Sequence, residues 1–223
     1  MTVATRPVQT DPMQHESSEA APLPVRQIRA AYTEQTVTVY QAYPPAIGEH
    51  AARHGEFPAD WSRSRMTWIK PSFRWMMYRS GYGTKPGQEV VLALEITRAG
   101  FESALGRAVL SHYDSEVHAD RAAWSKRLKE STVRVQWDPE RDLDLNPLGH
   151  RSLQLGLAGR ATRDYADHWL RAVRDVTPLA HRVRDLVRAG DRSAAAALLP
   201  AELPYPPVAV EVVRELRMSP QEI

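Results

Sequence analysis

The segment EVVLALEI, residues Glu89 to Ile96, is a nearly continuous apolar run and sets the strongest constraint on the fold. A strand with one face in water alternates apolar and polar residues, whereas a strand buried on both faces does not alternate. We therefore expect this segment to be an interior strand that other parts of the chain cover on both sides.

Four other segments read as strands. STVRVQW, residues 131–137, alternates cleanly, with Val133, Val135 and Trp137 on one face and Arg134 and Gln136 on the other. TVTVYQAY (residues 36–43) is rich in β-branched and aromatic residues, as strands are. RMTWIK (residues 65–70) and HRSLQLGL (residues 150–157) complete the set.

Helical segments lie between and after these strands. PPAIGEHAARHG (residues 44–55) has proline at its start and glycine at its end, and Pro71 and Ser72 open a helix over about Phe73 to Ser80. From Arg160 onward the pattern is helical throughout. The remaining helical segments are RAGFESALGRAVL (98–110), DRAAWSKRLKE (120–130), DYADHWLRAVRDV (164–176), LAHRVRDLVRAGD (179–191) and a short alanine-rich stretch. LPYPPVAVEVVRELRM (203–218) closes the chain with a proline-rich turn and one more helix.

These elements predict an α+β fold, a mixed sheet of about five strands with flanking helices, followed by a helical C-terminal region. Residues 1–24 are polar and aperiodic and predict a disordered tail. Residues 25–159 would form the α+β core, and residues 160–223 would pack on it. DPERDLDLNPLG (residues 138–149) is expected to be an acidic loop between two strands.

Charge and cysteine content exclude several functions. The net charge is +2, so attraction of the whole protein to nucleic acid or an anionic membrane is weak and any affinity for anions must be local. The absence of cysteine excludes disulfides, thiolate nucleophiles and cysteine-ligated metals. We find neither a signal peptide nor the roughly 20 apolar residues of a membrane span. We expect a cytoplasmic protein with no membrane partner, and the oligomeric state stays open.

One window is both basic and aromatic. Residues 61–88 contain six basic residues, six aromatic residues and no acid. Placed on the expected helix, Phe73, Met76 and Met77 share one apolar face. The opposite side is aromatic and basic, and it carries Trp75, Tyr78, Arg79 and Tyr82.

Two interpretations of this window stay open. In the first, Trp75 and Tyr78 pack under the C-terminal helices while the arginines cap carbonyls or pair with distant acids. In the second, the window forms an anion or nucleotide site, because arginine binds phosphate bidentately and aromatic rings stack on bases. GYGTKPG (residues 81–87) could let backbone N–H groups approach a phosphate, but it matches neither the Walker A spacing nor the GxGxxG spacing.

Histidine pairs give weaker signals. His50 and His54 have the spacing of zinc ligands on a helix, but Ala51 occupies the place of the general-base glutamate of the HExxH motif. Two solvent-facing histidines are the simpler interpretation. HYDSEVH (residues 112–118) reads as a polar loop, and no metal cofactor is expected.

Several segments together resemble the domain-of-unknown-function family 4291. They are Arg29 with Tyr32, VYQAY (39–43), RMTWIKPSFRWMMYRSGYGTKPGQE (65–89), ITRAGF (96–101), VQWDPERD (135–142) and RSLQLGLAG (151–159). The resemblance extends from about Val25 to the C-terminus, and it implies no activity by itself.

WIKPSFRWMMY (residues 68–78) followed by EVVLALEI is also similar to the DarT-type ADP-ribosyltransferase toxins. This similarity implies a split, mixed sheet that grips NAD. Lys70 or Arg74 would hold the NAD phosphates, Tyr78 would stack near the nicotinamide, and Glu140, which follows Pro139, would stabilise the oxocarbenium-like transition state. The other residues assigned to cofactor binding on this basis are Arg29, Tyr40 and Arg79.

These observations favour an NAD-dependent ADP-ribosyltransferase that acts on a nucleic acid or small-molecule acceptor. One alternative is a non-enzymatic nucleic-acid-binding module in which residues 61–88 contact phosphates and stack bases. A second alternative is an interaction protein whose C-terminal helices form a surface for a partner.

Overall fold

The computed structural model describes residues 23–220, so the expected tail, residues 1–24, lies almost entirely outside the described residues. The helices are α1 (Pro45–His54), α2 (Phe73–Ser80), α3 (Arg98–Arg107), α4 (Arg121–Glu130), α5 (Arg160–Asp164), the π-helix η1 (Tyr165–Trp169), α6 (Thr177–Arg188), α7 (Arg192–Ala197) and α8 (Val210–Glu215). The strands are β1 (Arg29–Ala30), β2 (Thr36–Tyr43), β3 (Thr67–Ile69), β4 (Val90–Thr97), β5 (Val109–Leu110), β6 (Val133–Arg141), β7 (Pro147–Leu157), β8 (Leu170–Asp175) and β9 (Leu203–Pro204). No helix among residues 23–220 is long and apolar enough to cross a bilayer.

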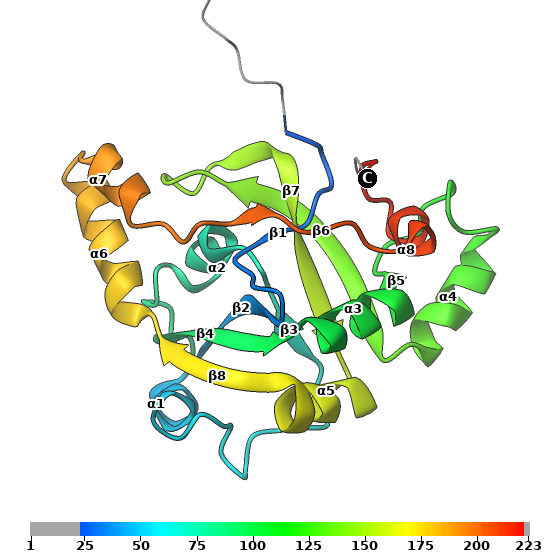
Figure 1. Cartoon of the computed structure of the whole chain (residues 1–223), viewed down its shortest axis with the longest axis horizontal. Helices are drawn as coiled ribbons and strands as arrows, with labels where there is room; N and C mark the ends of the chain where they lie inside the picture. Colours follow the sequence, from blue (N-terminus) through cyan, green and yellow to red (C-terminus); the bar gives the residue numbers. More distant parts are fainter. Residues whose placement is uncertain (1–22, 221–223) are drawn as a thin grey trace, which may run out of the picture.

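The strands form three sheets, with the orders β1-β9, β2-β4-β8 and β3-β7-β6-β5 (Figure 1). The interior strand β4 sends alternate side chains into two cores. Leu92, Leu94 and Ile96 pack in the larger core, and Val91 and Ala93 pack in the smaller one. Because both faces of β4 are covered, the continuous apolar run predicted its position correctly, and the α+β fold class is confirmed.

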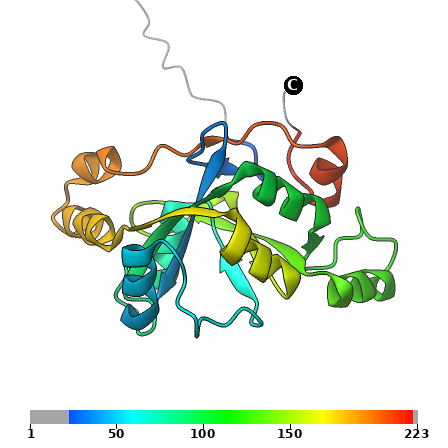
Figure 2. The same cartoon turned by 60° about the horizontal axis from the view of Figure 1, so that its bottom comes forward.

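The two larger sheets meet at a single isolated bridge between Tyr40 of β2 and Lys70 directly after β3. The backbone N–H of Tyr40 donates to the carbonyl of Lys70 over 2.7 Å. Helix α2 contacts β2 in one sheet and β6 in the other, so it lies between the two sheets (Figure 1). Figure 2 shows α6 and α7 at one end of the molecule and α4 at the opposite end.

Helix α2 begins and ends where the sequence predicts. The Ser72 side chain accepts the N–H of Trp75 over 3.0 Å, and Gly81 ends the helix at φ 60°. The expected apolar face is confirmed, since Phe73, Met76 and Met77 are almost fully buried in the smaller core. This face anchors α2 to the sheet that contains β4.

Tyr82 was expected on the opposite, aromatic and basic side, but it lies in the smaller core. The left-handed backbone of Gly81 and of Tyr82 itself, at φ 58°, turns the chain after the helix. The helical projection therefore does not extend to Tyr82. Its hydroxyl donates to the carbonyl of Leu143 over 2.8 Å.

The C-terminal region is mainly helical as predicted, but it also supplies two strands that the sequence analysis missed. The segment expected as one helix over residues 164–176 becomes strand β8 from Leu170 onward. β8 pairs antiparallel with β4, with Val173 opposite Leu94. The hydrogen bonds that β4 offers along its open edge override the helical pattern, because strand formation depends strongly on tertiary context.

The expected acidic loop over residues 138–149 is mostly strand. β6 continues to Arg141 and β7 begins at Pro147, which leaves only residues 142–146 as a turn. The pairing register shifts between Pro139 and Arg141, and such a bulge accommodates a proline within a strand. Glu140 therefore lies in a strand and not in a loop.

Candidate functional site

A cavity of about 770 Å³ opens where the two larger sheets meet, with α2 as one wall. Most of its lining comes from residues 61–88, so the basic and aromatic window gathers around one space. The rest comes from β2, from Pro44 and Ile47 at the start of α1, and from Gln136 of β6 and Gln154 of β7. No aspartate or glutamate is among the lining residues.

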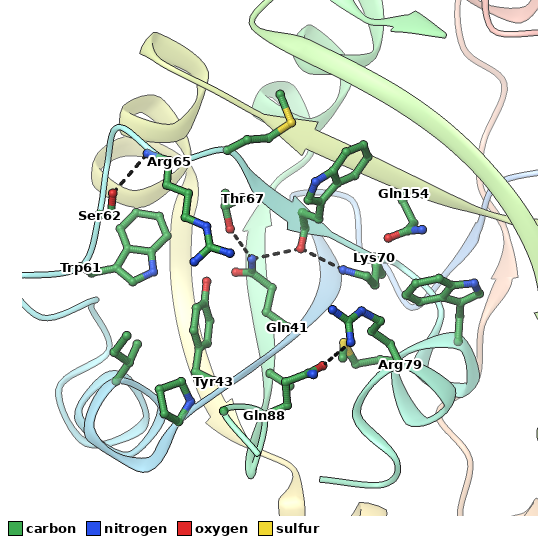
Figure 3. Close-up of a pocket in the computed structure, with 18 of the residues that line it drawn as sticks. Gln41, Tyr43, Trp61, Ser62, Arg65, Thr67, Lys70, Arg79, Gln88 and Gln154 are labelled. Carbon is green, nitrogen blue, oxygen red and sulfur yellow. Dashed lines mark hydrogen bonds between the residues drawn. The ribbon is translucent and has the colours of Figure 1, made fainter. Parts of the chain in front are cut away.

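Three basic side chains line this cavity, namely Arg65, Lys70 and Arg79. Their charged ends point into the same space (Figure 3). Within residues 23–220, none of the three has a carboxylate within 4.0 Å, and the guanidinium of Arg79 donates to the Gln88 side-chain oxygen over 3.1 Å. The cavity therefore holds positive charge that the described chain does not neutralise.

Lys70 is the most buried of these basic residues, at 6% exposure. Its ammonium donates to the Trp68 carbonyl over 3.2 Å and lies 5.4 Å from the centre of the Trp75 ring. Burial, and then the positive charge of Arg79, lower the pKa of Lys70 to about 7, while Asp138 acts in the opposite direction. Lys70 therefore carries a large neutral fraction near neutral pH.

The Gln41 amide is held on every side. The Tyr165 hydroxyl donates to its oxygen over 2.6 Å, and its nitrogen donates to the Thr67 hydroxyl over 2.7 Å and to the Trp68 carbonyl over 3.1 Å. Tyr165 opens the π-helix η1, a rare element that is frequent at functional sites. The amide therefore keeps one orientation in the cavity wall.

Asp138 connects two other amides of the lining. Gln136 and Gln154 face each other across β6 and β7, and the side-chain nitrogen of each donates to the Asp138 carboxylate. The first of these bonds is 2.9 Å long. The Asp138 carboxylate is not itself among the lining residues, but it fixes the two glutamines that are.

Aromatic side chains complete the lining. Trp61 stacks on Phe57 with ring centres 4.2 Å apart. Trp68 lies over Gly156 of β7, where an added Cβ would come within 2.9 Å of the indole. The indole N–H of Trp75 is buried and has no hydrogen-bond partner in the described part of the chain.

Of the seven residues predicted for catalysis or cofactor binding, Lys70 and Arg79 line the cavity. Tyr40 is 2% exposed and packs edge-to-face on Phe73 in the smaller core. Tyr78 is 37% exposed, and the guanidinium of Arg141 lies 3.6 Å from its ring centre. Tyr40 and Tyr78 therefore stand apart from the cavity.

The other three predicted residues, Arg29, Arg74 and Glu140, gather around a residue that the sequence analysis did not consider. This is Glu202, whose carboxylate accepts the backbone N–H of Phe73 at the start of α2 over 2.6 Å. The guanidinium of Arg29 donates to the carbonyl of Glu202 over 3.1 Å.

We call Glu202, Glu140, His150, Arg29 and Arg74 the Glu202 cluster, because their charges act on one another. Burial raises the pKa of Glu202 to about 8, and the nearby charge of Glu140 adds to this rise. The N–H of Phe73, Arg74 and Arg29 oppose it. Burial lowers the pKa of His150, whose Nε2 has no partner among residues 23–220.

The Glu202 cluster is separate from the cavity. Gln136 in the cavity lining and Glu140 in the cluster are four residues apart on β6, which places them roughly 13 Å apart along an extended strand. A catalytic role for Glu140 at the cavity would need a ligand that spans this distance.

The histidine motifs form no metal site in the described chain. His50 and His54 stack with ring centres 4.4 Å apart on α1. In the loop at residues 112–118, Asp114 and Glu116 pair with Arg217. Among residues 23–220, no three histidine, aspartate or glutamate side chains gather closely enough to hold a metal ion.

Comparison with known proteins gives a family but no activity. The sequence model of a family described as "Domain of unknown function (DUF4291)" matches residues 27–205, which is most of the chain. No curated protein matches this chain.

The raised pKa of Glu202 predicts how stability changes with pH. The ordinary pKa of a glutamate is 4.5 and the folded value is about 8, so the folded state binds the proton more tightly. The stability that protonated Glu202 gives the folded state is complete below pH 4.5 and is lost as the pH rises to about 8. Glu202→Gln keeps an acceptor for the N–H of Phe73 but cannot ionise. We expect this variant to be more stable than the wild type at pH 8.5 and equally stable at pH 5.

Thermal unfolding at these two pH values measures the effect. Glu211→Gln, an exposed position on α8, is the matched control and should leave the pH dependence unchanged. The melting temperature of the wild type should fall more between pH 5 and pH 8.5 than that of Glu202→Gln. If both proteins lose the same amount, the raised pKa of Glu202 is contradicted.

Proposed function

The chain belongs to the DUF4291 family, and we propose that the cavity between its two larger sheets binds a nucleotide. The observation that carries the proposal is the convergence of Arg65, Lys70 and Arg79 in a lining without acidic side chains. Uncompensated positive charge in a concave site favours an anionic ligand. The volume of about 770 Å³ lies within the range of roughly 300–1,000 Å³ that ligand sites occupy.

The two arginines are the phosphate ligands in this proposal. Arginine stays charged at all physiological pH values and binds phosphate oxygens through two parallel hydrogen bonds. Arg65 and Arg79 are both exposed at the mouth of the cavity, so their side chains can turn towards a ligand. Lys70 lies deeper and is partly neutral, and it contributes less to phosphate binding in the free protein.

The rest of the lining suits the other parts of a nucleotide. Tyr43, Trp61 and Trp68 offer ring surfaces on which a base can stack. Gln88 stands beside Arg79, so its amide can read the edge of a base, while the Gln41 amide, already bonded to Tyr165, Thr67 and Trp68, fixes the shape of the wall. A simple phosphate or sulfate would leave these groups unused.

NAD is the nucleotide that the proposal puts first. The segment that is similar to the ADP-ribosyltransferase toxins, residues 68–78, supplies Trp68, Lys70 and Trp75 to the lining. In the proposed reaction the bond between nicotinamide and ribose breaks, and nicotinamide leaves with the electron pair. An acceptor nucleophile on a nucleic acid or small molecule then bonds to the anomeric carbon and loses its proton.

The carboxylate for this reaction is better supplied by Asp138 than by Glu140. Both amide partners of Asp138 line the cavity, whereas Glu140 lies in the Glu202 cluster. A carboxylate close to the anomeric carbon would stabilise the positive charge that develops as the glycosidic bond breaks.

Binding tests the central part of the proposal. We expect NAD to bind with micromolar affinity and Arg79→Ala to weaken binding by about 10- to 100-fold, the effect of losing a hydrogen bond to a charged group. Isothermal titration calorimetry measures both. Arg188→Ala removes the same side chain from an exposed position on α6 and should leave the affinity unchanged.

No binding of NAD or ADP, or equal effects of Arg79→Ala and Arg188→Ala, would refute the nucleotide site. Binding of a single-stranded oligonucleotide instead, with affinity that falls steeply as salt rises, would support the nucleic-acid module.

Turnover tests the choice of carboxylate. We expect purified protein with NAD to release nicotinamide, and Asp138→Asn to lower the rate by at least about 100-fold, the scale of an electrostatic catalytic group. Glu140→Gln, an equally conservative change two residues further along β6, should keep most of the activity. Nicotinamide release is followed by chromatography. The reverse ranking of the two variants would restore Glu140 as the catalytic carboxylate.

A further inference from the structure

The amine of Lys70 has an environment unlike that of the other lysines in the chain. The sequence contains four lysines, at positions 70, 85, 126 and 129. Lys85, Lys126 and Lys129 are exposed, whereas Lys70 is 6% exposed and still lines the cavity. A buried lysine that still lines a cavity can use its amine to react with a ligand bound there.

The groups around Lys70 favour its neutral form. The indole of Trp75 on α2 and the peptide of Trp68 on β3 exclude water from the amine. The positive charge of Arg79 on α2 disfavours the charged form of the Lys70 amine. The Asp138 carboxylate on β6, which already accepts hydrogen bonds from two glutamines, favours the charged form, but its effect is smaller than that of Arg79. Within residues 23–220 no carboxylate lies within 4.0 Å of the amine.

The lowered pKa makes the Lys70 amine more reactive than that of an ordinary lysine. With a pKa of about 7, Lys70 is neutral to a large extent near pH 7.5, whereas an ordinary lysine, with a pKa of 10.5, is almost entirely charged. Only the neutral amine is a nucleophile, and desolvated lysines are the ones that form imines with carbonyl compounds.

The backbone also holds Lys70 in place. Its carbonyl accepts the N–H of Tyr40 at the bridge between the two sheets, and Ser72, two residues later, caps α2. The backbone that carries the amine is therefore fixed where the two sheets and α2 meet, and the Trp68 carbonyl accepts a hydrogen bond from the amine itself.

We propose that Lys70 is a covalent site for phosphorylated aldehydes and ketones, which its amine captures as an imine while Arg65 and Arg79 hold the phosphate. The inference rests on the anion-binding role proposed above for the two arginines. It does not depend on NAD being a ligand.

The reaction balances without a further reagent. The Lys70 nitrogen attacks the carbonyl carbon, and proton transfer through water gives a carbinolamine. The hydroxyl of that intermediate leaves as water once it is protonated, and a carbon–nitrogen double bond forms. The protonated imine is positively charged, and the negative charge of the Asp138 carboxylate, which favours the charged form of the Lys70 amine, would stabilise it.

Pyridoxal 5′-phosphate is a suitable probe because it joins an aldehyde to a phosphate. Wild-type protein is incubated with it at pH 7.5 and reduced with borohydride, and the modified lysines are mapped by peptide mass spectrometry. We expect saturable modification of Lys70 at concentrations at least about 10-fold lower than those needed for the other three lysines. Pyridoxal, which lacks the phosphate, should react much less, and pyrophosphate should protect Lys70.

Two variants separate the parts of the proposal. Arg79→Ala should lose the preference for pyridoxal phosphate over pyridoxal, and Lys85→Arg, beside the cavity on an exposed turn, should leave Lys70 labelling unchanged. Modification of Lys70 with no preference over Lys85, Lys126 and Lys129 overturns the proposal, even when nucleotides bind. Selective, phosphate-dependent labelling supports it, even when no nucleotide binds.

Discussion

The position of α2 between the two larger sheets is the constraint on which the site depends. The sheets containing β2 and β3 are linked by the backbone bridge between Tyr40 and Lys70, by the hydrogen bonds of the Gln41 side chain to Thr67 and Trp68, and by the larger core to which both contribute. An eight-residue helix fills part of the gap, held on one side by Phe73, Met76 and Met77 in the smaller core. The space that α2 does not fill is the cavity, so the same packing that stabilises the fold also creates the site.

This arrangement explains why polar groups are buried so close to the core. Gln41, Lys70 and Gln154 are each 6% exposed or less, and burying polar groups is unfavourable unless they are hydrogen-bonded. Gln41 and Gln154 are satisfied by Tyr165, Thr67 and Asp138. Lys70 has one acceptor, the Trp68 carbonyl at 3.2 Å, and the buried indole N–H of Trp75 has none in the described part of the chain, so the wall keeps unused hydrogen-bonding capacity.

Local sequence patterns predicted the parts of this structure that local interactions decide. The continuous run of β4 predicted an interior strand, and Pro71 and Ser72 predicted the start of α2. The acid-free window at residues 61–88 predicted where positive charge gathers, because most of the cavity lining lies within one short stretch of chain.

Long-range contacts decided the rest. Gln41, Gln136 and Gln154 come from three strands that only the folded sheets bring together, and a lone glutamine carries no pattern. Glu202 meets the start of α2 across 129 residues of sequence. Strand β8 reads as helix because its strand form depends on the edge of β4, and Glu140 was placed in a loop because a proline within a bulged strand resembles a turn.

In this proposal the positive charge of the cavity stays unneutralised until an anion binds. The pKa of Lys70 is the quantity that tests this most directly. Nuclear magnetic resonance of protein with labelled lysine side chains can follow the pKa of each of the four lysines. The account predicts that Lys70 titrates near pH 7 in the free protein and at clearly higher pH when ADP is bound, because a bound phosphate favours the charged amine. Titration of Lys70 near its ordinary pKa of 10.5 in both states would contradict it.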